Sequence, residues 1–206
     1  METYSQACQD IFIRKVLKNK LNGYFIEIGS CDPIFMNNTH VLEKNNNWKG
    51  IMVEYESHFL EKYKDIRKNS YHIIQDATTI DWNFHIKNAN LPYNIDYLQI
   101  DLDVHNGSTI QTLINLDKQV MDNYKFAVIT FEHDIYRGDY YNTRTLSREI
   151  FEKRGYMRIF SDVSLDNNAF EDWYIHPELV DLTHIEKFKN NLHDINDIKM
   201  YLNNIS

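Results

Sequence analysis

The sequence predicts an α/β fold with a mainly parallel central sheet and helices on both of its faces. Short apolar runs, typical of buried strands, alternate with amphipathic helix-like segments along most of the 206 residues. This alternation is typical of βαβ units, which build parallel sheets. Six glycines and three prolines leave no room for a linker, and no internal repeat is present. We therefore expect one domain over residues 1–206.

The elements follow in order. An N-terminal helix over residues 1–22 is expected to stop at Gly23, because glycine commonly ends a helix. Further helices, two of which begin with serine, a favoured N-cap, are expected at 39–46, 57–69, 108–116 and 143–155. Strands are expected at 24–30, 49–55, 71–77, 95–101 and 125–133, followed by an antiparallel pair at 156–162 and 170–177.

The last segment, residues 184–206, reads as an amphipathic tail helix. Its apolar side chains are Ile185, Phe188, Leu192, Ile195 and Ile198. We expect this stripe to pack against the core, with a homodimer contact as the alternative.

Composition limits the function. Hydrophobic residues make up 43% and charged residues 25%, as in an ordinary soluble globular protein. The net charge of −8 argues against binding nucleic acid or an anionic membrane, because both need a basic surface. No apolar run is long enough for a membrane span, and "METYSQACQD" lacks the pattern of a signal peptide. With only two cysteines, a reducing, cytoplasmic setting is expected.

Acidic side chains lie at the ends of the predicted parallel strands. The carboxyl ends of parallel strands meet at one edge of a sheet, where ligands bind. Any one of these carboxylates could cap a helix or stay solvated, but five that converge favour a site. The acids at the five strand ends are Glu27, Glu54, Asp76, Asp101 with Asp103, and Glu132 with Asp134.

The first strand ends in "FIEIGSCDP", where Gly29 allows a tight turn and close approach of a ligand. Cys31 and Asp32 stand where a G-x-G-x-x-G fingerprint would have glycines, so a pyrophosphate cradle is poorly supported. Glu54 follows about 25 residues later, at the place where an acid commonly accepts from ribose hydroxyls.

The stretch "GYFIEIGSCDPIFMNNTHVLEKNNNWKGIMVEYESHF" resembles the FkbM-like S-adenosylmethionine-dependent methyltransferases. The likeness continues through "DYLQIDLDVHNGSTIQTL" and "FEDWYIHPEL" and covers roughly residues 23–180; "CDP" replaces the family's third glycine. The resemblance implies a Rossmann-like class I methyltransferase fold with an antiparallel last strand. The motif positions are Glu27, Gly29, Asn38, Thr39, Leu42, Glu43, Trp48, Gly50 and Glu54. The implied S-adenosyl-L-methionine site comprises Glu27, Gly29, Ser30, Asn38, Thr39, Glu54, Asp76, Ala77 and Asp101.

The acidic motifs are also similar to those of the TylF-like sugar O-methyltransferases. "Asp101-Leu102-Asp103" and "Glu132-His133-Asp134" stand where that group carries metal-binding acids. The implied activity is O-methylation of a hydroxyl on a sugar or glycan, assisted by Mg²⁺ or Mn²⁺. The implied metal ligands are Asp101, Glu132, His133 and Asp134. Asp103 is the favoured general base in a metal-bound site, His133 is favoured without a metal, and His105 is a third candidate.

Three other functions remain open. Asp101-Leu102-Asp103 is also the D-x-D pattern of metal-dependent glycosyltransferases, although Glu27, Gly29 and Glu54 fit an adenosine site better. A nicotinamide-dependent oxidoreductase is disfavoured by the missing glycines, and a non-catalytic binding protein of the same fold is the third alternative. Aromatic residues of the second half could stack on a sugar ring or pack in the core: Tyr136, Tyr140, Tyr141 and Trp173.

Overall fold

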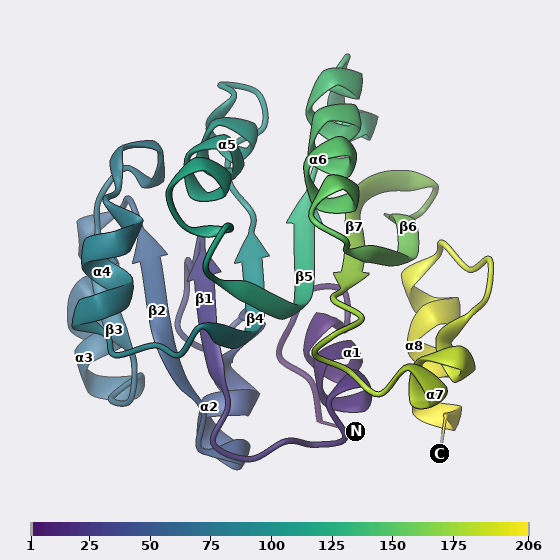
Figure 1. Ribbon diagram of the computed structural model, residues 1–206, viewed down its shortest axis with the longest axis horizontal. Coiled ribbons are helices and arrows are strands. Elements are labelled where there is room, and N and C mark those ends of the chain that lie inside the picture. The colour runs from purple at the N-terminus through teal and green to yellow at the C-terminus, as the bar shows by residue number, and fades with distance from the viewer. Residues whose placement is uncertain (1, 206) are drawn as a thin grey trace.

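A seven-stranded sheet forms the centre of the molecule, in the strand order β3-β2-β1-β4-β5-β7-β6 (Figure 1). The computed structural model describes residues 2–205. β1 to β5 pair in parallel and β7 runs antiparallel between β5 and β6. The predicted fold class is confirmed. The strands are β1 (Tyr24–Ile28), β2 (Lys49–Glu54), β3 (Tyr71–Ile74), β4 (Asn94–Ile100), β5 (Lys125–Glu132), β6 (Met157–Leu165) and β7 (Asn168–Ile175).

Helices cover both faces of the sheet, and each face has its own hydrophobic core. One face carries α4 (Trp82–Asn88), α5 (Ser108–Val120) and α6 (Tyr141–Lys153) (Figure 1). The other carries α1 (Gln9–Val16), α2 (His40–Asn46), α3 (Leu60–Ile66), α7 (Leu182–Ile185) and α8 (Ile195–Asn204). Short 3₁₀ turns are η1 (Ser57–Phe59), η2 (Ala77–Thr79), η3 (Ile135–Arg137) and η4 (Glu186–Phe188). α4, which was not expected from the sequence, begins after Asp81, whose side chain caps it.

The N-terminal helix is shorter than predicted. α1 begins only at Gln9, because the Asp10 carboxylate accepts hydrogen bonds from residues 3–5 and holds them in a non-helical turn. It ends at Val16 rather than at Gly23, since Lys18 and Asn19 adopt left-handed backbone angles. The prediction of a helix over residues 1–22 is therefore corrected to eight residues.

The tail is also not one helix. α7 and η4 are separated from α8 by residues 189–194, where Asn190 accepts from the Leu192 amide and Asp194 caps α8. These local side-chain bonds compete with helix formation. Ile185, Phe188 and Ile198 are buried in the core that contains α1. The predicted packing of this apolar stripe is confirmed, and a homodimer stays a prediction.

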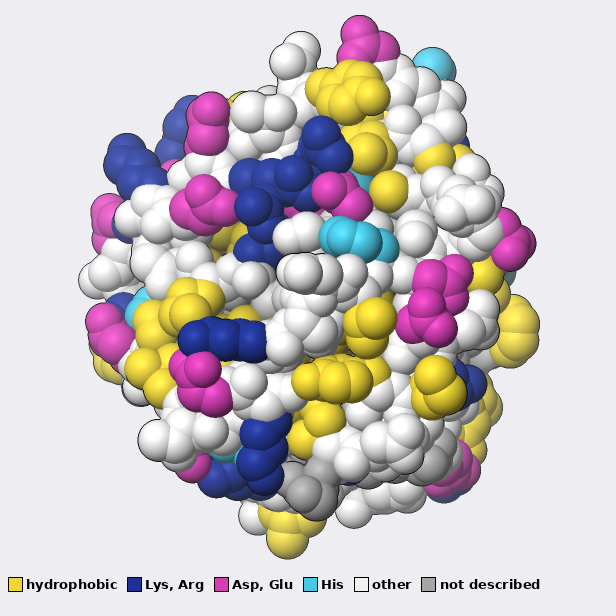
Figure 2. Space-filling model, turned by 90° about the vertical axis from the view of Figure 1, so that its right-hand side faces the viewer, with side chains coloured by type: hydrophobic (Ala, Val, Ile, Leu, Met, Phe, Trp, Pro, Cys, Tyr) yellow, Lys and Arg dark blue, Asp and Glu magenta, His cyan; other side chains and the backbone are white. Residues whose placement is uncertain are grey.

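Charged side chains of both signs lie close together on the edge that carries β6 and the C-terminal helices (Figure 2). Arg148 pairs with Asp162 at 2.9 Å, and Arg158 pairs with Glu152 at 3.4 Å. None of the helices within residues 2–205 is long and apolar enough to cross a membrane.

Candidate functional site

Two adjoining cavities open at the carboxyl ends of β1 to β4. The Gly29 cavity, about 530 Å³, is lined by Gly29, Cys31 and Asp101 among others. The Asp76 cavity, about 570 Å³, is lined by Asp76 and Ala77 among others. Both are also lined by Glu54, Leu102 and Asp103, which makes them neighbouring parts of one site.

Gly29 brings the end of β1 against the end of β4. Its φ is +83°, and a Cβ atom there would lie 1.8 Å from the carbonyl oxygen of Asp101. The Gly29 amide donates to the Val53 carbonyl at 3.0 Å, which fixes the turn against β2 as well. A side chain cannot be accommodated at this position, so the close backbone approach depends on glycine.

The loop after Gly29 is shaped by buried polar contacts instead of further glycines. The buried Glu27 carboxylate accepts from Asn37 Nδ2 at 3.0 Å and from Thr39 Oγ1 at 3.0 Å. Burial raises the pKa of Glu27, while the nearby Arg67 guanidinium and these hydrogen bonds oppose that rise. Ser30 donates through its hydroxyl to the Glu27 carbonyl at 2.9 Å. The loop thus has a fixed path although its sequence departs from the glycine-rich pattern.

Arg67, which the sequence analysis did not single out, completes this network from the end of α3. Its buried guanidinium donates to Glu43 at 2.8 Å, to Asn37 at 2.9 Å and to Thr39 at 2.6 Å. No sequence pattern distinguishes Arg67 from the exposed basic residues around it, because only tertiary packing buries it.

Four of the nine predicted cofactor residues are buried beneath the cavities and stabilise the loops that line them. Asn38 is also buried, and its amide donates to Gln99 at 2.6 Å on β4. Among the residues described, those that line the two cavities do not include Glu27, Ser30, Asn38 or Thr39. The other five predicted cofactor residues do line them: Gly29, Glu54, Asp76, Ala77 and Asp101.

Glu54 lies at the junction of the two cavities. Its carboxylate accepts from the amides of Cys31 at 2.8 Å, Tyr55 at 2.7 Å and Glu56 at 3.0 Å. A carboxylate offers about four acceptor positions, so capacity remains for a ligand hydroxyl. At the next strand end, Asp76 accepts from the Thr78 amide at 2.9 Å and caps η2.

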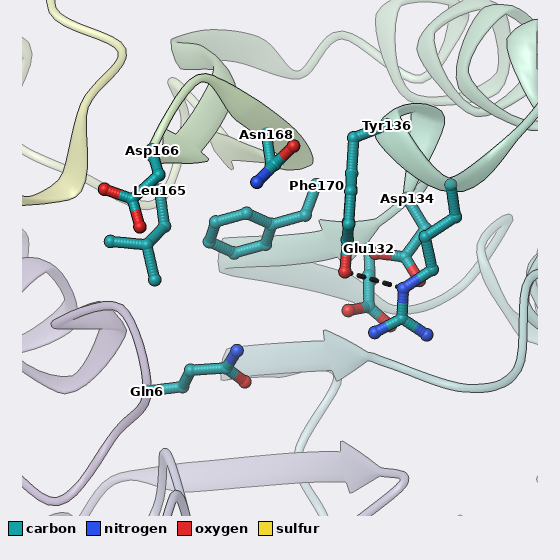
Figure 3. Close-up of a pocket in the computed structure, with 9 residues that line it drawn as sticks. Gln6, Glu132, Asp134, Tyr136, Leu165, Asp166, Asn168 and Phe170 are labelled. Atoms are coloured by element: carbon teal, nitrogen blue, oxygen red, sulfur yellow. Dashed lines mark hydrogen bonds and ion pairs between the residues drawn. The ribbon is translucent and has the colours of Figure 1, made fainter.

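A smaller pocket of about 120 Å³ lies beyond the end of β5, and we call it the β5 pocket (Figure 3). Carboxylates, free amides and an aromatic ring meet there. Gln6 lines this pocket as well as the Gly29 cavity, so the two spaces adjoin at that side chain. Its lining residues include Gln6, Glu132, Asp134, Tyr136, Asn168 and Phe170.

Asp101 and Glu132 form a carboxyl pair where the two spaces meet. Burial raises the pKa of both groups, and at Glu132 the negative charge of the neighbouring Asp101 carboxylate adds to the rise. Asp134 follows in a left-handed conformation with φ 49°, which aspartate adopts more readily than most residues other than glycine. Its Oδ2 lies 3.1 Å from Arg137 Nε.

The structure does not bring His133 to these acids. Glu132 ends β5 and lines the β5 pocket, whereas His133 is buried beside Asp162 and Asp172, the partners of Arg148 on α6. His133 Nε2 lies 3.5 Å from Asp162 and 3.7 Å from Asp172. The prediction that His133 joins Asp101, Glu132 and Asp134 around a metal is wrong on this geometry.

Within residues 2–205, His133, Asp162 and Asp172 are the one group of three or more histidine, cysteine or acidic side chains whose possible ligand atoms all lie within 4.8 Å of one another. Their carboxylates are already paired, since Arg148 donates to both aspartates at 2.7–2.9 Å. Arg144 donates to Asp162 as well, at 2.8 Å. This group is an ion-pair network, and the surrounding guanidinium groups disfavour a cation.

The other two candidate bases lie apart from each other. Asp103 is exposed, lines both large cavities and accepts from the His105 amide at 3.0 Å. The His105 ring lies 3.0 Å from the Tyr140 hydroxyl and lines neither cavity. Trp173 is fully buried and stacks on Phe12, so it packs in the core and is not available to a sugar.

No protein-family model matches the sequence, and no curated protein matches it. Solved structures do match the fold. A candidate methyltransferase from Streptococcus mutans, solved with S-adenosyl-homocysteine, gives a TM-score of 0.54 at 13% identity over 85% of this chain and 98% of the other.

Two further structures give TM-scores of 0.52. One is a TehB-like SAM-dependent methyltransferase from Corynebacterium glutamicum, at 11% identity over 82% of this chain and 86% of the other. The other is a candidate rRNA methylase from Clostridium thermocellum, at 12% identity over 85% of this chain and 99% of the other. With its antiparallel β7 between β5 and β6, the chain has the Rossmann-like fold of the class I SAM-dependent methyltransferases.

Proposed function

We propose that the protein is an S-adenosylmethionine-dependent O-methyltransferase that acts on a hydroxyl of a sugar or glycan. The observation that carries the proposal is the joined pair of cavities around Gly29 and Glu54, at the strand ends where ligands of this fold bind. The shared fold with SAM-dependent methyltransferases supports it.

The residues present fit the cofactor. The Asp76 cavity, with Asp76 and Ala77, suits an adenine, and Glu54 retains acceptor capacity for ribose hydroxyls. The Gly29 cavity, with Asp101 on its wall, suits the ammonium group at the amino-acid end of the cofactor. S-adenosylmethionine supplies an activated methyl group on its sulfonium, and the protein has to bind and align the acceptor.

The β5 pocket suits the acceptor. It adjoins the Gly29 cavity at Gln6, and it combines hydrogen-bonding groups with the ring of Phe170. Hydroxyl groups need both donors and acceptors, and the apolar face of a sugar ring packs on an aromatic ring. Asp103, at the boundary of the two large cavities, remains the proposed base.

A divalent cation is part of the proposal through Asp101, Glu132 and Asp134. Oxygen ligands of this kind suit Mg²⁺ or Mn²⁺. The ligand atoms of the three do not all lie within 4.8 Å of one another among the described residues. Binding a cation would require the carboxylates to draw together and both Asp101 and Glu132 to ionise, against the burial that raises their pKa. Loss of activity on treatment with EDTA, restored by Mg²⁺ or Mn²⁺, would support this part of the proposal.

One titration separates the alternatives. In isothermal calorimetry we expect binding of S-adenosylmethionine at micromolar concentration and none of UDP-glucose or NAD. Binding of UDP-glucose alone would favour the glycosyltransferase, and binding of NAD alone would favour the oxidoreductase. Cofactor binding without methyl transfer to any acceptor would favour a binding protein of the same fold.

A further inference from the structure

The N-terminal segment of residues 3–6 crosses between the cofactor cavities and the β5 pocket. Asp10, fully buried, accepts from Thr3 Oγ1 at 2.7 Å, the Tyr4 amide at 2.9 Å and Ser5 Oγ at 2.9 Å. The Tyr4 carbonyl accepts from the Asn37 amide at 3.2 Å, which ties the segment to the loop after Gly29. The backbone just before Gln6 is therefore held by Asp10 and by the loop after Gly29.

Gln6 has an exposed side chain in this otherwise fixed segment. It lines both the β5 pocket and the Gly29 cavity, and Figure 3 shows its amide directed toward the pocket, across from Phe170. Within residues 2–205, the Gln6 side chain is exposed and its carboxamide has no hydrogen-bond partner. Its donor and acceptor atoms are therefore available to a ligand.

Other groups in the pocket specify the chemistry of that ligand. Asn168 adds a second carboxamide on the opposite wall, from the start of β7. Three carboxyl side chains, Glu132, Asp134 and Asp166, line the pocket together with one cation, Arg137, which is already paired with Asp134 at 3.1 Å. An uncharged group rich in hydroxyls fits such a lining, whereas a phosphate would meet the carboxylates.

We propose that Gln6 is an acceptor-binding residue: its amide hydrogen-bonds a sugar hydroxyl next to the reacting one, and so selects which hydroxyl faces the methyl donor. This inference rests on the proposed function and adds to it the residue that sets acceptor position. Gln6 lies where the β5 pocket meets the Gly29 cavity. A hydrogen bond there therefore fixes the acceptor relative to the cofactor more directly than a contact deeper in the β5 pocket.

The test compares Gln6→Ala with the wild type and with Gln111→Ala. Gln111 is an exposed glutamine on α5 that lines neither the β5 pocket nor the two cavities. The probes are the methyl glycosides of glucose, galactose, mannose and rhamnose, with radiolabelled S-adenosylmethionine as donor. Calorimetry gives the cofactor Kd, kinetics give kcat and KM for the acceptor, and NMR of the product gives the position methylated.

We expect Gln6→Ala to lower kcat/KM for the acceptor roughly tenfold to a hundredfold, as expected for a lost hydrogen bond to a positioned hydroxyl. The methylated positions should become mixed, while the cofactor Kd stays unchanged and Gln111→Ala behaves as the wild type. Unaltered acceptor kcat/KM and position in Gln6→Ala would overturn the inference while leaving the proposed function intact. A wild type that binds the cofactor but methylates no sugar would overturn the proposed function.

A binding measurement that does not depend on turnover completes the test. In ¹⁵N-labelled protein saturated with S-adenosyl-homocysteine, the side-chain amide signal of Gln6 is identified by its absence in Gln6→Ala. Addition of the methyl glycosides at millimolar concentration should shift that signal and leave the Gln111 signal in place. A sugar that shifts signals of the β5 pocket but not that of Gln6 would contradict the assignment.

Discussion

Replacement of Glu54 by alanine tests the proposed cofactor site at the junction of its two cavities. The carboxylate accepts from three backbone amides, at 2.7–3.0 Å, and retains capacity for the ribose hydroxyls. In Glu54→Ala the ribose hydroxyls lose their acceptor. The hydrogen bonds to this charged group are worth about 1–3 kcal/mol in all. Since about 1.4 kcal/mol is a factor of ten, the Kd for the cofactor should rise roughly 5- to 150-fold.

The assay is calorimetric titration of S-adenosylmethionine into the wild type, Glu54→Ala and a control. Glu61→Ala serves as the control, because Glu61 is an exposed glutamate on α3 that lines neither large cavity. The Cys31 amide also loses its partner in Glu54→Ala, so the loop could loosen and the melting temperature must be measured alongside. Equal cofactor affinity in Glu54→Ala and the wild type would refute the placement of the ribose.

Four further predictions concern stability, metal and the proton. Gly29→Ala should destabilise the protein well beyond the about 1–2 kcal/mol of left-handed strain, because its Cβ would meet a main-chain oxygen at 1.8 Å. Gly107 also has a positive φ, of +81°, but a Cβ there would meet no atom of a non-neighbouring residue within 4 Å, so Gly107→Ala should show only that strain in urea unfolding. Burial, assisted by a nearby carboxylate, raises the pKa of Glu171 from 4.5 to about 8, so the free energy of unfolding should fall as pH rises through this window. Glu171→Gln should not lose stability in this way. Its melting temperature should exceed that of the wild type at pH 8.5 and equal it at pH 4. A lower melting temperature than the wild type at pH 8.5 would contradict the assignment. EDTA should abolish methyl transfer and Mg²⁺ should restore it, and full activity in EDTA would exclude the cation. Asp103→Asn should lower kcat at least roughly 10²-fold with the cofactor Kd intact, while His133→Gln, buried behind the sheet, should affect stability more than kcat.

The sheet and the cofactor edge could be predicted from the sequence because they depend on local patterns. Apolar runs mark the strands, and an acid directly after such a run has to lie at the carboxyl edge of a parallel sheet. Glu54, Asp76 and Asp101 were placed in this way, and each lines a cavity. The need for glycine at position 29 also followed from the chain turning there, and its contact with the end of β4 gives the physical reason.

Other features depend on contacts between distant segments. Arg67 could not be singled out, because its partners Glu43, Asn37 and Thr39 approach it only in the folded chain. Gln6 lies before the first helix and reaches the site because Asp10 turns the segment back. His133 directly follows β5, and its burial depends on its contacts with Asp162 on β6 and Asp172 on β7. The predicted metal site nevertheless included His133, because its sequence neighbours resemble an acidic metal-binding motif.

The most direct test of the account is a crystal structure of the protein with S-adenosyl-homocysteine. In that structure we expect the ribose hydroxyls at Glu54, the adenine beside Asp76 and Ala77, and the amino-acid end in the Gly29 cavity. The sulfur should face the space that Gln6 lines. A ligand bound elsewhere on the chain, or a protein that does not bind S-adenosyl-homocysteine at millimolar concentration, would contradict the central claim that these strand ends form a methyl-donor site.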